Sequence, residues 1–372
     1  GAKGGASWQA IEVALGRLAG LDAARIVLVD GAYVEELSSI ETLGDGARVM
    51  PLAKALGDAC FAEVHGGPIA VDQDHAVVAL NTAFMTDGAA IHLSATPARA
   101  IHIVHVVSGT SEQLVSTRNV INVGDEVSAT VIESFVALEE ASTQVNALTH
   151  LGVGRGARVK HIKVQRENAA STHLSTWVVE LGAEADYRGF QFSVGATLAR
   201  NQIALKFGGE GARADISGAT LIGGRQHCDT TLVVDHAVPA CESRELFKAV
   251  LDDEARCVFQ GKVVVRPDAQ KTDGKQMAQA LMLSEACEFD AKPELEIYAD
   301  DVACGHGATC AEIDPDLVFY CRSRGIGEAE AKALITMSFI GEAIEKVEDE
   351  ALAEALGALA EEWLAGRQRR GA

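Results

Sequence analysis

Aromatic side chains and long apolar runs are both scarce in this sequence. Phe, Trp and Tyr make up 5% of the 372 residues, whereas glycine alone occurs 36 times. This composition favours closely stacked backbone layers over a core of large rings. No uninterrupted apolar run reaches about 18 residues, and the opening segment GAKGGASWQA has no signal-peptide core. We therefore predict neither a membrane span nor secretion.

Positive charge is also in short supply. The chain has 32 Lys and Arg residues against 53 Asp and Glu residues, which gives a net charge of −21. Nucleic acid and anionic membranes would repel such a surface, so neither is expected as a partner. The eight cysteines form no CxxC pair, which favours free thiols in a reducing, cytoplasmic compartment over a disulfide framework.

The motifs of common catalytic sites are missing as well. The chain contains no GxxxxGK[ST] loop for nucleotide phosphates, no HExxH and no GxSxG. The segment GVGRG at 152–156 lacks the strand and helix that flank a dinucleotide-binding loop, so we interpret it as a turn. These absences favour a protein without catalytic residues of its own.

Both ends of the chain have helical periodicity. Apolar residues recur at intervals of three or four between Trp8 and Leu18, and a strand is expected at 25–29. Two apolar stripes on either side of the acidic segment 348–350 predict a helical hairpin, which would cap the end of the core, dock a partner or do both. The stripes comprise Leu334, Met337, Ile340, Ile344 and Val347, then Leu352, Leu356, Leu359 and Trp363.

From about 61 to 322, short apolar strands alternate with turns that resemble one another. Several of these turns are spaced by about 28 residues, which is typical of a solenoid, although the fourth and fifth are further apart. We predict a mainly β fold, a β-helix or another β-solenoid, with a Greek-key sandwich as the alternative. The turns are VGDEVSA (123–129), VGRGARV (153–159), LGAEADY (181–187), FGGEGARA (207–214), LDDEARC (251–257) and LSEACEF (283–289).

Two groups of histidine and cysteine are weak candidates for a metal site. His102 and His105 are three positions apart, so in a regular strand they point to opposite faces. The second group consists of His227, Cys228, His236 and Cys241. The spacing of these residues matches no tetrahedral zinc site.

The segment LEIYADDVACGHGATCAEI (295–313) contains the strongest candidate site. Cys304 and His306 are two positions apart, so in an extended strand both side chains leave the same face. If the strand continues unbroken, Glu296 and Tyr298 share that face. A mixed Cys/His site can hold an iron–sulfur cluster, but two ligands do not complete a coordination sphere. Further ligands would have to come from elsewhere in the chain or from a second subunit; otherwise Cys304 is a packing residue and His306 a surface histidine.

The sequence around this segment resembles a known family. KPELEIYADDV, C-x-HGAT and FYxRSRGI, all within 259–326, are similar to motifs of the SufB/SufD iron–sulfur cluster assembly scaffold family, and to its SufD-type members in particular. The resemblance is strong over about 240–345 and fainter over about 80–240. Near the N-terminus only RIVLVDGAYVEELS is similar.

This resemblance implies a fold and a set of partners. The family fold is a right-handed parallel β-helix with flanking α-helical terminal regions. It divides this chain into a shortened, mixed N-terminal region (1–60), a β-helix core (61–326) and a C-terminal helical region (327–372). SufD-like chains pair with a SufB-like subunit, and each scaffold chain binds a SufC-like ABC ATPase through its C-terminal helices.

The resemblance also implies the site. His306 matches an interfacial histidine that holds the nascent iron–sulfur cluster together with a cysteine of the SufB-like partner. Cys304 matches a nearby cysteine, whereas Cys310 departs from the family pattern. The cluster would be transient and shared with the partner, so we expect no tightly bound cofactor in the isolated chain, and a non-catalytic scaffold.

Two other functions stay open. A β-helix enzyme acting on polysaccharide would use clustered carboxylates, for which Glu294 and Glu296 with the adjacent Asp300 and Asp301 are the candidates. Adjacent Asp residues in a strand point to opposite faces, and few aromatic residues are present to stack on sugars. Alternatively, the chain forms a homodimeric scaffold without a SufB-like mate. The cluster type and the sulfur donor do not follow from the sequence.

Overall fold

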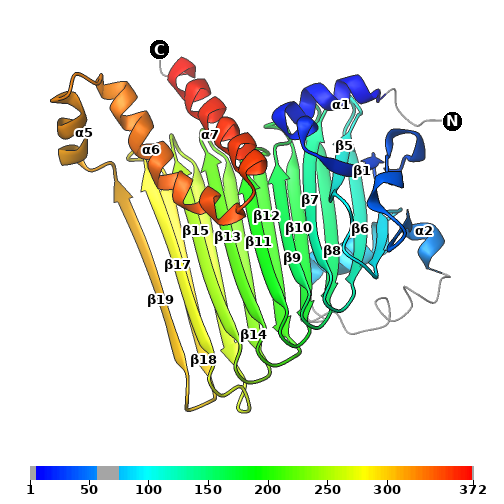
Figure 1. The fold of residues 1–372 in the computed structure, drawn as a ribbon. Helices are drawn as coiled ribbons and strands as arrows, with labels where there is room; N and C mark the ends of the chain where they lie inside the picture. The colour runs from blue at the N-terminus through cyan, green and yellow to red at the C-terminus, as the bar shows by residue number, and fades with distance from the viewer. Residues whose placement is uncertain (1–5, 57–74, 371–372) are drawn as a thin grey trace.

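Parallel strands dominate the computed structural model, which describes residues 6–56 and 75–370 (Figure 1). One sheet, called sheet A here, has ten strands and the other, sheet B, has nine. Sheet A contains β1 (Ala23–Val29), β2 (Ala32–Tyr33), β5 (Ala100–Val107), β7 (Ser128–Ala137), β9 (Arg158–Gln165), β11 (Asp186–Ser193), β13 (Arg213–Ile222), β15 (Glu242–Leu251), β17 (Asp273–Met282) and β19 (Ala303–Glu312). Sheet B contains β3 (Ala47–Pro51), β4 (Ala89–Leu93), β6 (Gln113–Val123), β8 (Thr143–Val153), β10 (Thr172–Leu181), β12 (Leu198–Phe207), β14 (His227–His236), β16 (Arg256–Val265) and β18 (Glu288–Ile297).

Successive strands from β4 onwards alternate between the two sheets. Each strand pairs in parallel with the strand two places further along the chain, as β10 does with β12. The antiparallel pairs are β1 with β2 and β3 with β4, both at the N-terminal end. This is a parallel β-solenoid, so the predicted β-helix is confirmed. The Greek-key alternative is wrong, because its strands would pair antiparallel.

The irregular interval in the sequence repeat has a structural cause. The first four turn segments, up to 207–214, connect a strand of sheet B to the next strand of sheet A. The last two, 251–257 and 283–289, connect sheet A to sheet B at the opposite corner of the solenoid. The longer interval therefore contains an additional half coil. At these corners consecutive coils stack closely: a Cβ atom on Gly209 would lie 2.0 Å from the backbone nitrogen of Ala183.

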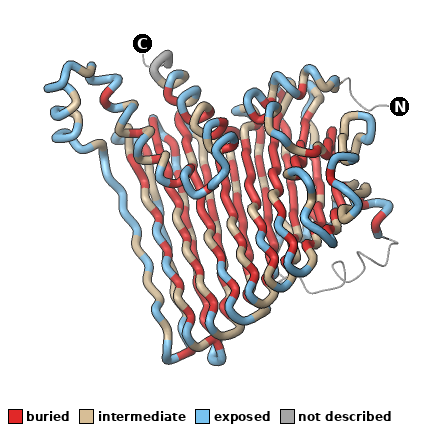
Figure 2. Tube along the Cα trace, in the orientation of Figure 1, coloured by how far each residue is buried: buried red, intermediate tan, exposed pale blue. Residues whose placement is uncertain are grey.

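The residues between the two sheets are buried over most of the length of the solenoid, and a large apolar cluster runs through them (Figure 2). Trp177, Tyr187 and Phe207 are fully buried there with many aliphatic residues, and buried polar side chains such as Glu133, His161 and Lys163 occupy other inward positions. Inward-facing side chains stack in rows along the solenoid, because parallel strands in register place equivalent residues side by side. Burial falls in the last coil, where most residues of β18 and β19 are intermediate or exposed (Figure 2).

Helices cover the outer side of sheet A. They are α1 (Trp8–Leu15), followed by the 3₁₀ segment η1 (Gly16–Gly20), then α6 (Glu328–Ile344), η4 (Glu345–Val347) and α7 (Glu350–Arg370). Helix α5 (Pro315–Arg322) joins β19 to α6, contacts α6 and has no buried residue. Two further helices, α2 (Leu52–Ala55) and α4 (Ala76–Phe84), contact sheet B. The periodicity near both termini therefore predicted the helices correctly.

The predicted role of the hairpin as an end cap is wrong. Helix α6 contacts β13 and β15, and its residues Ile340 and Ala343 are buried against the outer side of sheet A (Figure 1). Lys248 of β15 binds the Glu342 carboxylate and lies 4.3 Å from the ring of Phe339. The hairpin formed by α6 and α7 thus lies across the flank of the solenoid. The β18–β19 end is left without a cap among the described residues.

The domain boundaries stay predictions. The boundary after residue 60 lies outside the described residues. Strand β1, within the range 1–60, already belongs to sheet A, because it pairs in parallel with β5. At the other end the chain changes from strand to helix between β19 and α5, before position 327. No helix in the described part of the chain is long and apolar enough to span a membrane.

Candidate metal-binding site

The terminal strand β19 carries the two predicted ligands. It is continuous from Ala303 to Glu312, so Gly305 and Gly307 do not interrupt it. Cys304 and His306 therefore leave the same side of the strand. The Cys304 side chain packs against the interior core, which places this side inward, toward the space between the two sheets. His306 is exposed because no further coil covers it.

The expectation that Glu296 and Tyr298 share this face is wrong. Glu296 lies on β18, in the other sheet, and Tyr298 follows that strand. A turn at residues 298–302 separates the two strands, so the alternation of faces does not carry over from one to the other. Glu296 binds Lys262 at 2.6 Å.

The carboxylates considered for polysaccharide chemistry are also arranged otherwise than expected. Glu294 binds Lys292 at 3.0 Å on the outer side of β18. Asp300 and Asp301 lie in the turn rather than in a strand, where the backbone N–H of Asp301 donates to Gln270 Oε1 at 2.9 Å. The rule of opposite faces therefore does not apply to this pair.

Two inward rows of residues lead to the candidate ligands. Strands β15, β17 and β19 are in register, which aligns Ser243 with Gly274 and Cys304. A Cβ atom on Gly274 would lie 3.6 Å from the Cys304 sulfur, so the thiol packs beside a residue that has no side chain. The thiol is half-buried, and this burial, with the nearby charge of Asp273, raises the pKa of Cys304. Binding a metal would therefore displace a proton from the thiol.

The second row aligns Glu245 with Gln276 and His306. The Gln276 amide packs against Gly261 of the facing sheet. A Cβ atom on Gly261 would lie 2.3 Å from Gln276 Oε1. Glu245 is 3% exposed, and neither of its carboxylate oxygens has a hydrogen-bond partner. The Ser243 hydroxyl, its neighbour on the strand, is engaged with His236 Nε2 at 3.0 Å.

Burial raises the pKa of Glu245 to about 8, with a smaller contribution from the charge of Asp215. Its carboxyl is therefore neutral at pH 7 and can exchange a proton near that pH. Sequence reasoning missed Glu245 and Gln276. The coil repeat could have found them, since both precede His306 by about one or two periods.

A groove of about 590 Å³ lies on the outer side of sheet A, between β19 and η4. Its lining includes the outward-facing Arg244, Lys275 and Met277 and the ion pair of Lys346 with Asp215, whereas Cys304 and His306 border it from the strand that separates it from the solenoid interior. Cys310, further along β19, is exposed. Among the described residues, no group of three or more His, Cys, Asp or Glu side chains is arranged as a metal site. Cys304 and His306 thus form a pair of candidate ligands at a surface.

The other histidine and cysteine groups are structural. His102 donates to or accepts from Ser134 Oγ at 2.8 Å, whereas His105 lies inside the solenoid, stacked on Phe135. The prediction of opposite faces is confirmed. In the second group, His236 stacks on Phe207, and Cys228 lies directly beside Cys257 of the next coil in an apolar cluster.

Comparison with known proteins agrees with the fold and with the resemblance of the motifs. The family model described as SUF system FeS cluster assembly, SufBD core domain, matches residues 105–339, and the one described as SufBD protein N-terminal region matches residues 12–101. The chain therefore belongs to the SufB/SufD family of iron–sulfur cluster assembly proteins.

Individual relatives extend this match over most of the chain. The iron-sulfur cluster assembly protein SufD of Escherichia coli is 33% identical over 336 residues, which cover 89% of this chain and 77% of that protein. An iron-sulfur cluster assembly SufBD family protein of Synechocystis is 30% identical over 347 residues, or 87% of this chain and 74% of the relative. The predicted similarity to SufD-type members is confirmed.

Proposed function

We propose that this chain is a scaffold subunit that pairs with a SufB-like chain at the open end of its solenoid. The nascent cluster is cargo, held between the two chains by His306, with Cys304 beside it, and by a thiol of the partner. The uncapped last coil, with both side chains facing its open interior, is the observation that carries this proposal.

The strand edges at this end suit such a pairing. β18 and β19 are the last strands of their sheets, and each has one edge without a neighbouring strand among the described residues. Free edges pair readily with another chain. The inward side of β18 also offers apolar surface, since Ile297 is 40% exposed. A partner continuing both sheets would bury this surface and cover His306.

The ligand set suits a transient cluster. An imidazole and a thiol both bind iron, and a site completed only by a second chain can release its cargo when the chains separate. The raised pKa of Cys304 disfavours a permanent thiolate in the isolated chain. These properties suit assembly and transfer better than storage. We also propose a cytoplasmic location for this chain.

The C-terminal helices are proposed to dock a SufC-like ABC ATPase. Large apolar side chains are exposed on α5 and α6, including Phe319 at 74%, Tyr320 at 55% and Leu334 at 50%. Exposed apolar groups clustered on two adjacent helices are typical of an interface. The docking surface would then begin at α5, ahead of the predicted start at 327. Closure of the ATPase pair on ATP would draw the docked hairpins together and reshape the cluster interface.

Replacement of His306 tests the proposed ligand role. In a complex reconstituted anaerobically with a SufB-like and a SufC-like protein, His306→Ala should lower iron and sulfide content several-fold without changing complex formation. Thr309→Ala, on the same strand, is the matched control and should leave cluster yield unchanged. Full yield from the His306→Ala complex would remove this residue from the site.

A homodimer formed through the same β18–β19 end is the alternative to pairing with a SufB-like chain. Size-exclusion chromatography with light scattering would detect it in the isolated chain. If an excess of the SufB-like protein does not convert the homodimer into a mixed complex, the proposed pairing is wrong.

A further inference from the structure

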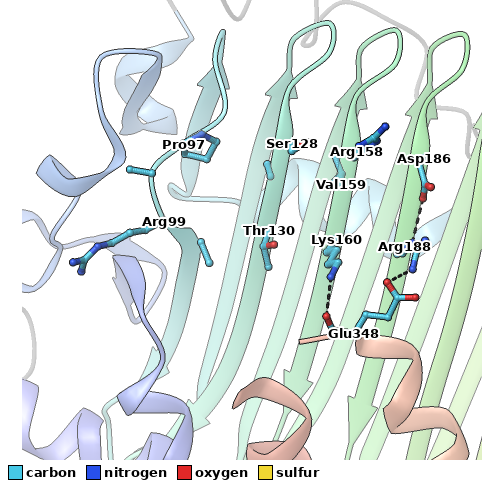
Figure 3. Close-up of a pocket in the computed structure, with 13 residues that line it drawn as sticks. Pro97, Arg99, Ser128, Thr130, Arg158, Val159, Lys160, Asp186, Arg188 and Glu348 are labelled. Atoms are coloured by element: carbon cyan, nitrogen blue, oxygen red, sulfur yellow. Dashed lines mark hydrogen bonds and ion pairs between the residues drawn. The ribbon is translucent and has the colours of Figure 1, made fainter. Parts of the chain in front are cut away.

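A second hollow lies on the outer side of sheet A, away from the open end (Figure 3). It has a volume of about 420 Å³ and is lined by β7, β9, β11, the segment 97–100 before and at the start of β5, and Glu348 between η4 and α7. Small residues at Ala98 and Ala100 leave the space open on the β5 side. This volume is in the range of sites for small molecules.

The hollow is basic in a chain whose net charge is −21. Four cationic side chains line it and only two acidic ones do. Both acidic groups bind the same cation: Arg188 contacts the carboxylates of Asp186 and Glu348 (Figure 3). Arg99 points away from the hollow and binds Asp22 at 2.9 Å.

The two remaining cations keep their charge uncompensated. Arg158 has no ion pair within the described ranges. Lys160 Nζ donates to the backbone carbonyl of Glu348 at 3.0 Å, and a carbonyl does not neutralise an ammonium (Figure 3). The two residues lie two positions apart on β9, on the same outward side, so their Cα atoms are about 6.6 Å apart along the strand.

Two hydroxyl-bearing residues lie beside these cationic residues on the neighbouring strand β7. Ser128 pairs in register with Arg158, and Thr130 pairs with Lys160, so each hydroxyl-bearing residue lies about 4.8 Å from a cationic one. A guanidinium, an ammonium and two hydroxyl donors match the oxygens and the double negative charge of a phosphate group. We propose that this hollow binds a phosphate group, either inorganic phosphate or the monoester of a small organic molecule.

The position of the site connects it to the hairpin. Glu348 has a left-handed backbone, with φ of 51°, and is held there through its carbonyl by Lys160 and through its carboxylate by Arg188. A phosphate bound to Lys160 would compete with the Glu348 carbonyl for the ammonium. Occupancy of the hollow and the conformation of the hairpin connector would then be linked.

Isothermal titration of the full chain with inorganic phosphate and with glycerol 3-phosphate tests the site. We expect saturable, salt-sensitive binding that weakens at least about tenfold in the double variant Arg158→Gln, Lys160→Gln, the loss typical of removing charged donors. Arg213→Gln, on the same outer side but paired with Glu242, is the control and should bind as the unmodified chain does. Circular dichroism confirms that both variants fold.

The two ligands distinguish the source of the phosphate. If glycerol 3-phosphate binds more tightly than inorganic phosphate, the rest of the hollow contacts the organic part of the ligand. If the two affinities are equal, the site recognises inorganic phosphate. No saturable binding of either ligand at 10 mM-scale concentrations, or equal loss in the Arg213→Gln control, would overturn the proposal.

Discussion

The buried carboxyl of Glu245 should make the stability of this protein depend on pH in a predictable direction. Its pKa is about 8 in the folded protein against 4.5 for an ordinary glutamate, because burial disfavours the charged form of its carboxyl. Between these two values the folded state holds a proton that the unfolded state has lost. Stability from this group is therefore fully present below about pH 4.5 and falls as the pH rises toward 8.

The size of the effect follows from the pKa difference. One pKa unit corresponds to about 1.4 kcal/mol, so burial of Glu245 costs about 3 kcal/mol at pH 7 and approaches about 5 kcal/mol above pH 8. Glu245→Gln keeps the shape and removes the ionisation. The difference in unfolding free energy between variant and parent should thus grow by about 3 kcal/mol from pH 5.5 to pH 8.

Urea denaturation of both proteins at a series of pH values measures this difference. Arg244 and Asp215 are the charged neighbours of Glu245, and they are unchanged in both proteins, so their titration cancels in the comparison. Glu242→Gln, a half-exposed glutamate on the same strand, is the control and should give a curve parallel to the parent. Parallel curves for Glu245→Gln as well would refute the account of its buried, neutral state.

Three further changes test the packing of the solenoid. Gly88→Ala would place a Cβ atom 1.7 Å from a backbone carbonyl of the next coil, so we expect a loss of several kcal/mol by urea denaturation, whereas Gly20→Ala, with open space around it, should be nearly neutral. Glu133→Gln removes a buried carboxylate that accepts from histidine, tryptophan, threonine and asparagine side chains, and thermal denaturation should show a loss of about 3 kcal/mol or more. Lys248→Met removes the buried ammonium that anchors α6, and amide exchange should accelerate in that helix while the strands stay protected.

The sequence predicted the coils because each has its own turn residues. The segments around 123–129 and 181–187 contain an apolar residue, a glycine or acidic turn and a return to strand, and this local chemistry repeats in several coils. The switch to the opposite corner before 251–257 was not predicted, because both corners use the same residue types. Only the pairing of strands across coils distinguishes them.

The candidate site was predicted only in part. Cys304 and His306 lie on one strand, so their spacing alone placed them on one face. Glu296 lies on β18, before the turn that leads into β19. Because these two strands belong to different sheets, the alternation of faces along β19 does not extend back to Glu296, and its predicted position was wrong. Glu245 and Gln276 reach the site through register with earlier coils, which involves positions far apart in the sequence.

The position of the helical hairpin depends on contacts that the sequence pattern does not contain. An apolar stripe shows that α6 is buried on one side but does not identify the surface that buries it. Here that surface is the outer side of β13 and β15, fixed by the Lys248–Glu342 ion pair and by Lys346 with Asp215 at 3.2 Å. This placement leaves the last coil uncovered within the described part of the chain.

The most direct test of the shared site is the iron and sulfide content after anaerobic reconstitution, measured for this chain alone and for its mixture with a SufB-like and a SufC-like protein. The account predicts a visible-absorbing cluster in the mixture and little or none in the isolated chain, because Cys304 and His306 supply only part of a coordination sphere. A stable, stoichiometric cluster in the isolated chain, or none in the assembled complex, would contradict it.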